Sequence, residues 1–183
     1  MALKQNLMGT IWQKKGSWRM EHIQLTAPDG RSADSLRIVH PGSVVLIPLT
    51  AEGNVVMIRQ YRLPINQVIL EVPAGTKEWD EDSEICAQRE LREETGYRAK
   101  RFDLVCKFWP GPALADELMH LYIARDLTHD PLPMDFDEEI ETAEIPLDEL
   151  VAMALDGRMQ DGKSIVAILR AHAWLTNEKT VRD

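Results

Sequence analysis

Three glutamates in one short segment are the residues of this chain best suited to metal chemistry. Glu90, Glu93 and Glu94 are three and four positions apart in a segment rich in helix-forming residues. Residues at these spacings share one face of a helix, so the three carboxylates point the same way. Like charges at this spacing destabilise a helix, whereas Mg²⁺ prefers carboxylate oxygens. The spacing therefore predicts a divalent-metal site; the alternative is a solvated helix whose acids pair with Arg89 and Arg92.

The helix that would carry these acids has clear sequence limits. Asp82 or Ser83 suits the N-cap, and Gly96 suits the position just after the last turn, so a helix is expected from Ser83 to Thr95. Amphipathic or apolar β-branched patterns predict strands around it. These segments are 9–39, 43–49, 55–60, 68–72, 102–108 and 118–124. Further helices are expected at 147–155 and 163–174, which together predict an α/β or α+β fold with a mixed sheet.

Composition and charge exclude several functional classes. The 183 residues fit one domain, or one domain with a small appendage, and the net charge is -9. That balance argues against nucleic-acid binding, which needs a basic surface. No apolar run is long enough for a signal peptide or a membrane span, so no membrane partner is expected. Cys86 and Cys106 show no metal-ligand spacing, and reduced thiols in a cytoplasmic protein are expected.

The acidic helix lies within a longer pattern of fixed residues. The pattern reads G-x5-E-x7-R-E-U-x-E-E-x-G-U, where U is an apolar residue. Its fixed positions are Gly75, Glu81, Arg89, Glu90, Glu93, Glu94 and Gly96. This is the Nudix box, and the chain resembles the Nudix hydrolase family. Tyr97 at the last apolar position, in place of an aliphatic residue, is a mild departure.

The resemblance implies an α/β/α sandwich with a mixed β-sheet, and a loop–helix–loop that binds Mg²⁺ or Mn²⁺. It implies metal ligands at Glu90, Glu94 and the carbonyl of Ala74, with Glu93 as a further ligand or a base. It also implies that Arg89 and Glu81 hold the loop against the helix. Pyrophosphate hydrolysis agrees with such a site, since bound metal neutralises phosphate charge and activates water.

Segments outside the box resemble the ADP-ribose pyrophosphatase branch of this family. They are residues 40–45, 59–62, 70–75, 109–117, 119–124 and 161–165, within a resemblance that covers roughly 36–172. The branch implies hydrolysis of a nucleoside diphosphate sugar, with ADP-ribose cleaved to AMP and ribose 5-phosphate. GDP-mannose hydrolases share most of these features, so GDP-mannose or a broad substrate range is the alternative. A non-catalytic nucleotide-sugar sensor is a further alternative, although such domains usually lose acids that this box keeps.

Three side chains outside the box are candidates for substrate contact. Arg62 is predicted to bind a substrate phosphate, because a guanidinium matches phosphate in a bidentate way. Arg59 is a weaker candidate for the same role, and Glu117 is a candidate for orienting ligands or water. The alternative for each is an exposed side chain with a structural ion pair or none.

An acidic segment near the C-terminal third, residues 133–141, is predicted to be a mobile loop. In the branch that the chain resembles, a glutamate of this loop closes over the metal site as general base or ligand. Glu138 and Glu139 are the candidates here, and a loop that merely aids solubility is the alternative. Closure of such a loop would exclude water and complete the site.

The first forty residues exceed what a minimal Nudix fold needs. Residues 1–40 are predicted to form an antiparallel β extension and dimerisation arm, and residues 41–183 the Nudix domain. The resemblance implies a homodimer in which an exchanged arm lends an aromatic side chain to the partner's base pocket. Trp12 and Trp18 are the candidates for stacking on the base; strand packing or a dimer contact is the alternative.

Overall fold

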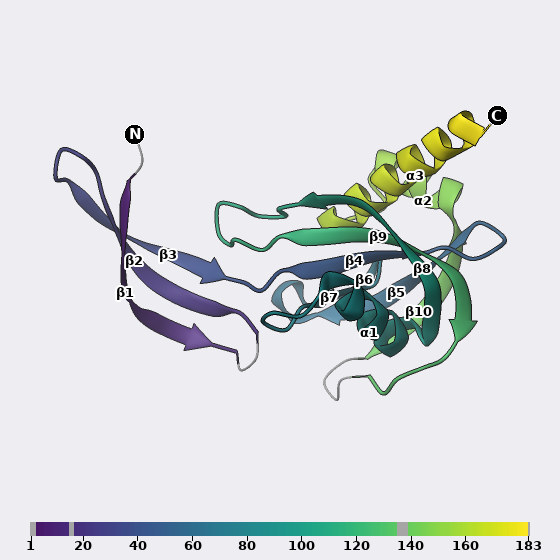
Figure 1. Ribbon diagram of the computed structural model, residues 1–183, viewed down its shortest axis with the longest axis horizontal. Coiled ribbons are helices and arrows are strands. Elements are labelled where there is room, and N and C mark those ends of the chain that lie inside the picture. The colour runs from purple at the N-terminus through teal and green to yellow at the C-terminus, as the bar shows by residue number, and fades with distance from the viewer. Residues whose placement is uncertain (1–2, 15–16, 135–138, 183) are drawn as a thin grey trace.

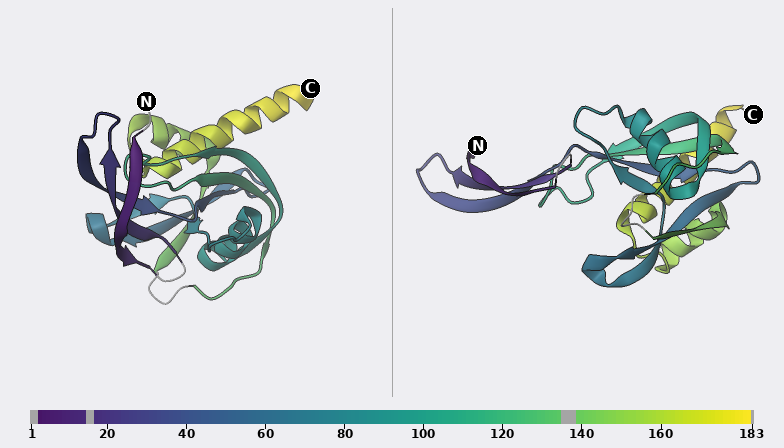
Figure 2. Two further views of the ribbon diagram at one scale, coloured as in Figure 1. Left: turned by 60° about the vertical axis from the view of Figure 1, so that its left-hand side comes forward. Right: turned by 90° about the horizontal axis from the view of Figure 1, so that it is seen from below.

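Three N-terminal strands form an antiparallel sheet that projects away from the rest of the protein (Figures 1 and 2). The computed structural model describes residues 3–14, 17–134 and 139–182. The strands of this arm are β1 (Lys4–Gln13), β2 (Arg19–Thr26) and β3 (Ser32–Val39). Gly30, with a φ of +86°, lies in the turn between β2 and β3, where the Pro28-Asp29-Gly30 signal predicts one. The dipeptide Lys15-Gly16 is a turn signal as well, and it lies outside the described residues.

The remaining strands form two sheets. The first has the order β7-β4-β9-β8 and contains β4 (Ser43–Pro48), β7 (Ala74–Thr76), β8 (Tyr97–Phe108) and β9 (Met119–His129). The second has the order β10-β5-β6 and contains β5 (Asn54–Arg62), β6 (Gln67–Glu71) and β10 (Ile140–Pro146). A short 3₁₀ helix, η1 (Leu63–Ile65), joins β5 to β6. Strands β4 and β9 are parallel whereas their other neighbours are antiparallel, so the mixed sheet is confirmed.

Helices cover both faces of the four-stranded sheet, which gives the expected α/β/α sandwich (Figure 1). They are α1 (Ser83–Thr95), α2 (Leu147–Asp156) and α3 (Gly162–Arg182). Every residue of β4 is buried, and successive side chains of a strand point to opposite faces. Val44 and Leu46 pack with α1, whereas Val45 and Ile47 pack with residues of α2 and α3.

Two short strands and one long helix differ from the sequence-based expectation. Strand β7 forms backbone hydrogen bonds with β4, although the sequence predicts no strand there. Strand β10 forms backbone hydrogen bonds with β5, although the sequence predicts a loop at its start. Ile140 and Glu141 belong to β10, which means that the predicted acidic loop ends before them. Such pairing joins segments far apart in the chain, so local sequence patterns do not show it. Helix α3 also runs beyond its expected end at Trp174.

No helix in the described part of the chain is both long enough and apolar enough to cross a membrane.

Candidate active site

Local sequence fixes both ends of helix α1. The side chain of Asp82 accepts hydrogen bonds from the N–H groups of Glu84 (2.8 Å) and Ile85 (3.3 Å). At the other end Gly96 is left-handed, with a φ of +75°, and its N–H bonds to the carbonyl of Arg92. An N-cap of this kind stabilises a helix by about 1 kcal/mol. The helix therefore begins and ends where the sequence predicts, and this sets the direction of its acids.

The acids of α1 lie against strand β7. Glu90 and Glu94 are buried, with exposed fractions of 8% and 4%. Glu94 Oε2 accepts the N–H of Ala74 at 2.8 Å. The Glu90 carboxylate packs on the α-carbon of Gly75, so closely that a Cβ at position 75 would overlap it. Glycine is thus the residue that permits this approach of helix and strand.

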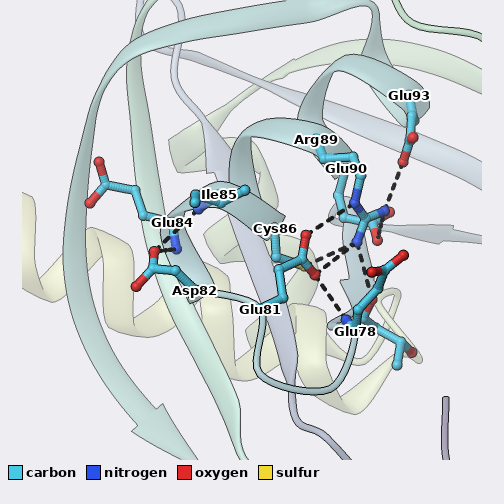
Figure 3. Close-up of polar contacts among 10 residues, drawn as sticks. Glu78, Glu81, Asp82, Glu84, Ile85, Cys86, Arg89, Glu90 and Glu93 are labelled. Carbon is cyan, nitrogen blue, oxygen red and sulfur yellow. Dashed lines mark hydrogen bonds and ion pairs between the residues drawn. The ribbon is translucent and has the colours of Figure 1, made fainter. Parts of the chain in front are cut away.

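Arg89 lies among the acids of the box, as Figure 3 shows. Its Nη1 donates to Glu90 Oε1 at 2.7 Å and to Glu93 Oε2 at 3.0 Å. Its Nε and Nη2 donate to Glu81 at 3.3 and 3.2 Å, and Nη2 also donates to the carbonyl of Thr76 at 3.3 Å. One guanidinium therefore connects the loop, β7 and the helix.

Electrostatics reinforce this connection. Burial opposes the charged form of Arg89, but hydrogen bonds to Glu81 and the charge of Glu90 outweigh it and raise the pKa of Arg89. Burial also opposes ionisation of Glu81, yet hydrogen bonds from Arg89 and from the N–H of Glu78 lower the pKa of Glu81 below its usual value. The two residues predicted to hold the loop against the helix are thus paired, and that role stays a prediction.

The oxygen atoms of this site suit a hard divalent cation. Glu90 and Glu94 place two buried carboxylates beside β7, where Glu94 accepts the N–H of Ala74, and Mg²⁺ favours oxygen ligands. In the described residues, no three acidic, histidine or cysteine side chains already form a metal-binding group. Arg89 instead pairs with Glu90 and Glu93. The chemistry of these oxygen donors fits Mg²⁺ or Mn²⁺.

Arg62 and Arg59 have different surroundings. Arg62 donates from Nε and Nη2 to the two carboxylate oxygens of Glu71, both at 2.7 Å. Hydrogen bonding to Glu71, with a further contribution from the charge of Glu94, raises the pKa of Arg62. Arg59 is exposed, and strand alternation directs its side chain to the opposite face of β5. The structure therefore brings Arg62, and not Arg59, toward the acidic helix.

Glu117 lies at the edge of the four-stranded sheet. Its Oε1 accepts a hydrogen bond from Ser43 Oγ and is 3.9 Å from His40 Nε2. Ser43 is paired with Thr76 at the end of β7, which places Glu117 beside the strand that carries the box glycine. Burial lowers the pKa of His40, against the opposing charge of Glu117. Glu117 is thus engaged in a structural contact, and its predicted substrate role stays a prediction.

The two tryptophans predicted to stack on a base are both in the N-terminal arm. Their ring centroids are 4.8 Å apart and the rings are tilted by 45°. Trp12 is 49% exposed, whereas Trp18 is partly buried. They therefore pack against one another in a single subunit, with part of Trp12 open for contact.

A third tryptophan, Trp79, joins the arm to the loop of the box. Its Nε1 donates to the carbonyl of Ser17 at 2.7 Å, and the guanidinium of Arg19 lies over its ring, 5.2 Å from the centroid. Trp79 was not among the residues predicted from the sequence, although a large aromatic among the acids of a loop was a usable signal. The loop before α1 is therefore in direct contact with the N-terminal arm.

The acidic loop is described only in part. Glu139 is exposed and immediately precedes β10, whereas Glu138 lies outside the described residues. Both stay predictions as the general base.

Comparisons with known proteins agree with this fold. The NUDIX domain model matches residues 39–167. A methanol dehydrogenase activator from Bacillus methanolicus is 37% identical over 143 residues, 77% of each chain. An ADP-ribose pyrophosphatase from Bacillus subtilis is 34% identical over 151 residues, 81% of this chain and 80% of that one. A GDP-mannose pyrophosphatase from Yersinia enterocolitica is 29% identical over 178 residues, 91% of each.

The chain therefore belongs to the NUDIX family. A solved ADP compounds hydrolase has the same fold, with a TM-score of 0.80 at 21% identity over 96% of both chains. The expected Nudix fold, including its mixed sheet and helical layers, is confirmed.

Proposed function

We propose that the protein hydrolyses the pyrophosphate bond of a nucleoside diphosphate sugar, with ADP-ribose as substrate and AMP and ribose 5-phosphate as products. The observation that carries this proposal is the packing of the Glu90 and Glu94 carboxylates on β7, where Gly75 leaves room for them. The names of two relatives, an ADP-ribose pyrophosphatase and a GDP-mannose pyrophosphatase, support this class of substrate.

Mg²⁺, or Mn²⁺, is the proposed cofactor. Glu90, Glu94 and the carbonyl of Ala74 would hold it, with Glu93 as a further ligand or a base. A divalent ion bound there neutralises phosphate charge and lowers the pKa of water. Arg89 keeps Glu90 and Glu93 oriented through its hydrogen bonds.

The remaining predicted residues act on the substrate. Arg62 binds a phosphate of the substrate, and Glu138 or Glu139 removes the proton of the attacking water. Arg59 and Glu117 are secondary candidates for contact with the substrate or with water. Support for Arg62 comes from its raised pKa and fixed guanidinium, which keep it a cation at every working pH.

A homodimer is part of the proposal, with residues 1–40 as its arm and residues 41–183 as the Nudix domain. Support comes from the exposed apolar side chains of β1, among them Leu7 (58%) and Ile11 (57%), which a second subunit would cover. Trp12 or Trp18 would then contact the base bound by the partner subunit. A cytoplasmic location is proposed as well, supported by the two free cysteine thiols.

Two alternatives remain open. GDP-mannose, or a broad range of nucleotide sugars, would use the same phosphate chemistry with different base contacts. A sensor that binds nucleotide sugars without turnover is the alternative from another class. One relative is named as an activator of methanol dehydrogenase.

A product assay decides between these readings. Purified protein is incubated with Mg²⁺ and either ADP-ribose or GDP-mannose, and the nucleoside monophosphate is quantified. Glu94→Gln is the test variant, and Glu84→Gln is the matched control, because Glu84 is an exposed acid of the same helix. We expect wild type and Glu84→Gln to turn over ADP-ribose and Glu94→Gln to lose most activity. Binding without turnover by wild type would favour the sensor.

A further inference from the structure

A fully buried glutamate, Glu71, lies at the end of β6 between two cations. Both of its oxygens accept hydrogen bonds from Arg62 at 2.7 Å. Lys163, at the start of α3, donates to Oε2 from the other side. A buried carboxylate is costly unless it is paired and hydrogen-bonded, so both cations offset the cost of burying Glu71. The mechanism proposed above uses Arg62 and gives no role to Glu71 or Lys163.

The start of α3 holds Lys163 in place. Asp161 Oδ2 is 2.9 Å from Lys163 Nζ and accepts the N–H of Ser164 at 3.0 Å. The hydroxyl of Ser164 donates to Asp161 and accepts the N–H of Val72 at 2.9 Å. Val72 is two residues before Ala74, the residue proposed to supply the metal-binding carbonyl. The segment Asp161-Gly162-Lys163-Ser164 is therefore connected to Glu71 and Val72, at the end of β6.

The guanidinium of Arg62 has one nitrogen that Glu71 does not engage. The hydrogen bonds to Glu71 use Nε and Nη2, and Nη1 has no hydrogen-bond partner in the described residues, so it can donate to another ligand. The side chain of Arg62 is 38% exposed, whereas that of Lys163 is 11% exposed. Arg62 can thus meet a solvent-borne anion, and Lys163 cannot do so without leaving its two acidic partners.

We infer that Lys163 is a positioning residue that acts through Glu71 to hold the Nη1 edge of Arg62 toward a substrate phosphate. The inference rests on the proposed function and assigns a role to the Asp161–Ser164 segment. Without Lys163, Arg62 would be the only cation paired with the buried Glu71 carboxylate among the described residues. Its guanidinium would then shift toward Glu71 and away from the substrate phosphate. A preorganised guanidinium binds phosphate without first losing freedom, so its displacement should weaken binding of the substrate.

The test measures equilibrium binding of ADP-ribose by calorimetry without divalent metal, alongside KM and kcat with Mg²⁺. For Lys163→Met we expect Kd and KM to rise roughly tenfold, as when one charge-assisted hydrogen bond is lost, with a much smaller change in kcat. Lys163→Arg should restore most of the affinity. Lys100→Met, which removes an exposed lysine of β8, is the matched control and should bind as wild type does.

A double-mutant cycle separates positioning from general stability. If Lys163 acts through Arg62, Lys163→Met combined with Arg62→Lys should weaken binding little more than Arg62→Lys alone. Additive losses, or unchanged affinity in Lys163→Met, would overturn the inference. If Lys163→Met does not fold, Glu71→Gln with Lys163→Met removes both buried charges, should fold, and should still bind weakly. Wild-type affinity in that variant would also overturn the inference.

Failure of the proposed function gives a different result. A wild-type protein that binds ADP-ribose without cleaving it would contradict the proposed hydrolysis, and the same titrations would still decide the role of Lys163. A wild-type protein that does not bind ADP-ribose would overturn the inference itself.

Discussion

The α-carbon of Gly75 packs directly on the carboxylate of Glu90, with no room for a Cβ between them. Two fixed residues of the box, one on β7 and one on α1, thus form one structural unit. A glycine is required here because the helix and the strand approach each other closely. Its backbone gives no further reason, since Gly75 is not among the described glycines that have a positive φ angle.

Gly75→Ala should displace Glu90 and reduce both stability and activity. Forcing a methyl group into a packed contact costs about 1–3 kcal/mol of unfolding free energy. Denaturant unfolding and turnover of ADP-ribose measure the two effects. Gly9→Ala is the control, because a Cβ at Gly9 would meet no atom within 4 Å. Full activity in Gly75→Ala would contradict the proposed metal site.

Arg89→Lys should lower activity by roughly 10–100-fold, the usual cost of losing a group that orients metal ligands. A lysine ammonium cannot contact Glu81, Glu90 and Glu93 in the forked geometry of the guanidinium. Mn²⁺ binding followed by electron paramagnetic resonance should weaken in parallel. Arg98→Lys, at an exposed position on β8, is the control. Loss of activity with unchanged Mn²⁺ affinity would instead assign Arg89 to substrate binding.

Glu81→Gln should destabilise the protein in a pH-dependent way. Folding lowers the pKa of Glu81 below its ordinary value of 4.5, so the ionised side chain stabilises the fold above that pH. This contribution is lost as the pH falls through the folded-state pKa. The difference in Tm between wild type and Glu81→Gln should therefore be largest near neutral pH and shrink below about pH 4.5. Glu52→Gln, an exposed acid in a turn, should show no such trend, and an equal difference at all pH values would contradict the pairing with Arg89.

Trp79→Phe should loosen the contact between the arm and the box loop. It removes the hydrogen bond to the carbonyl of Ser17 and keeps an aromatic ring beneath Arg19. The expected loss of unfolding free energy is about 1 kcal/mol. Trp79→Ala should lose roughly a further 0.5–1 kcal/mol with the cation–π contact. Denaturant unfolding measures both; Trp109→Phe is the control, since Trp109 is 60% exposed and makes no side-chain hydrogen bond to the described residues.

The sequence by itself determined the helix that carries the acids. Asp82 caps it, Gly96 ends it, and the spacing of Glu90, Glu93 and Glu94 sets their common face. These features depend on residues within one or two helical turns of each other. The geometry of an α-helix over that distance is the same in any fold, so the sequence is enough to predict them. The family and its sandwich fold were predicted from the resemblance that the box pattern carries rather than from this local geometry.

Only the tertiary structure decided which distant groups meet that helix. Lys163 and Glu71 are 92 positions apart, and Trp79 contacts Ser17 from 62 positions away. The pairings of β7 with β4 and of β10 with β5 are likewise absent from any local pattern. Glu71 lies within the apolar run VILEV, and its cationic partners Arg62 and Lys163 come from other elements. Contacts of this kind depend on how the chain packs, which residue spacing does not encode.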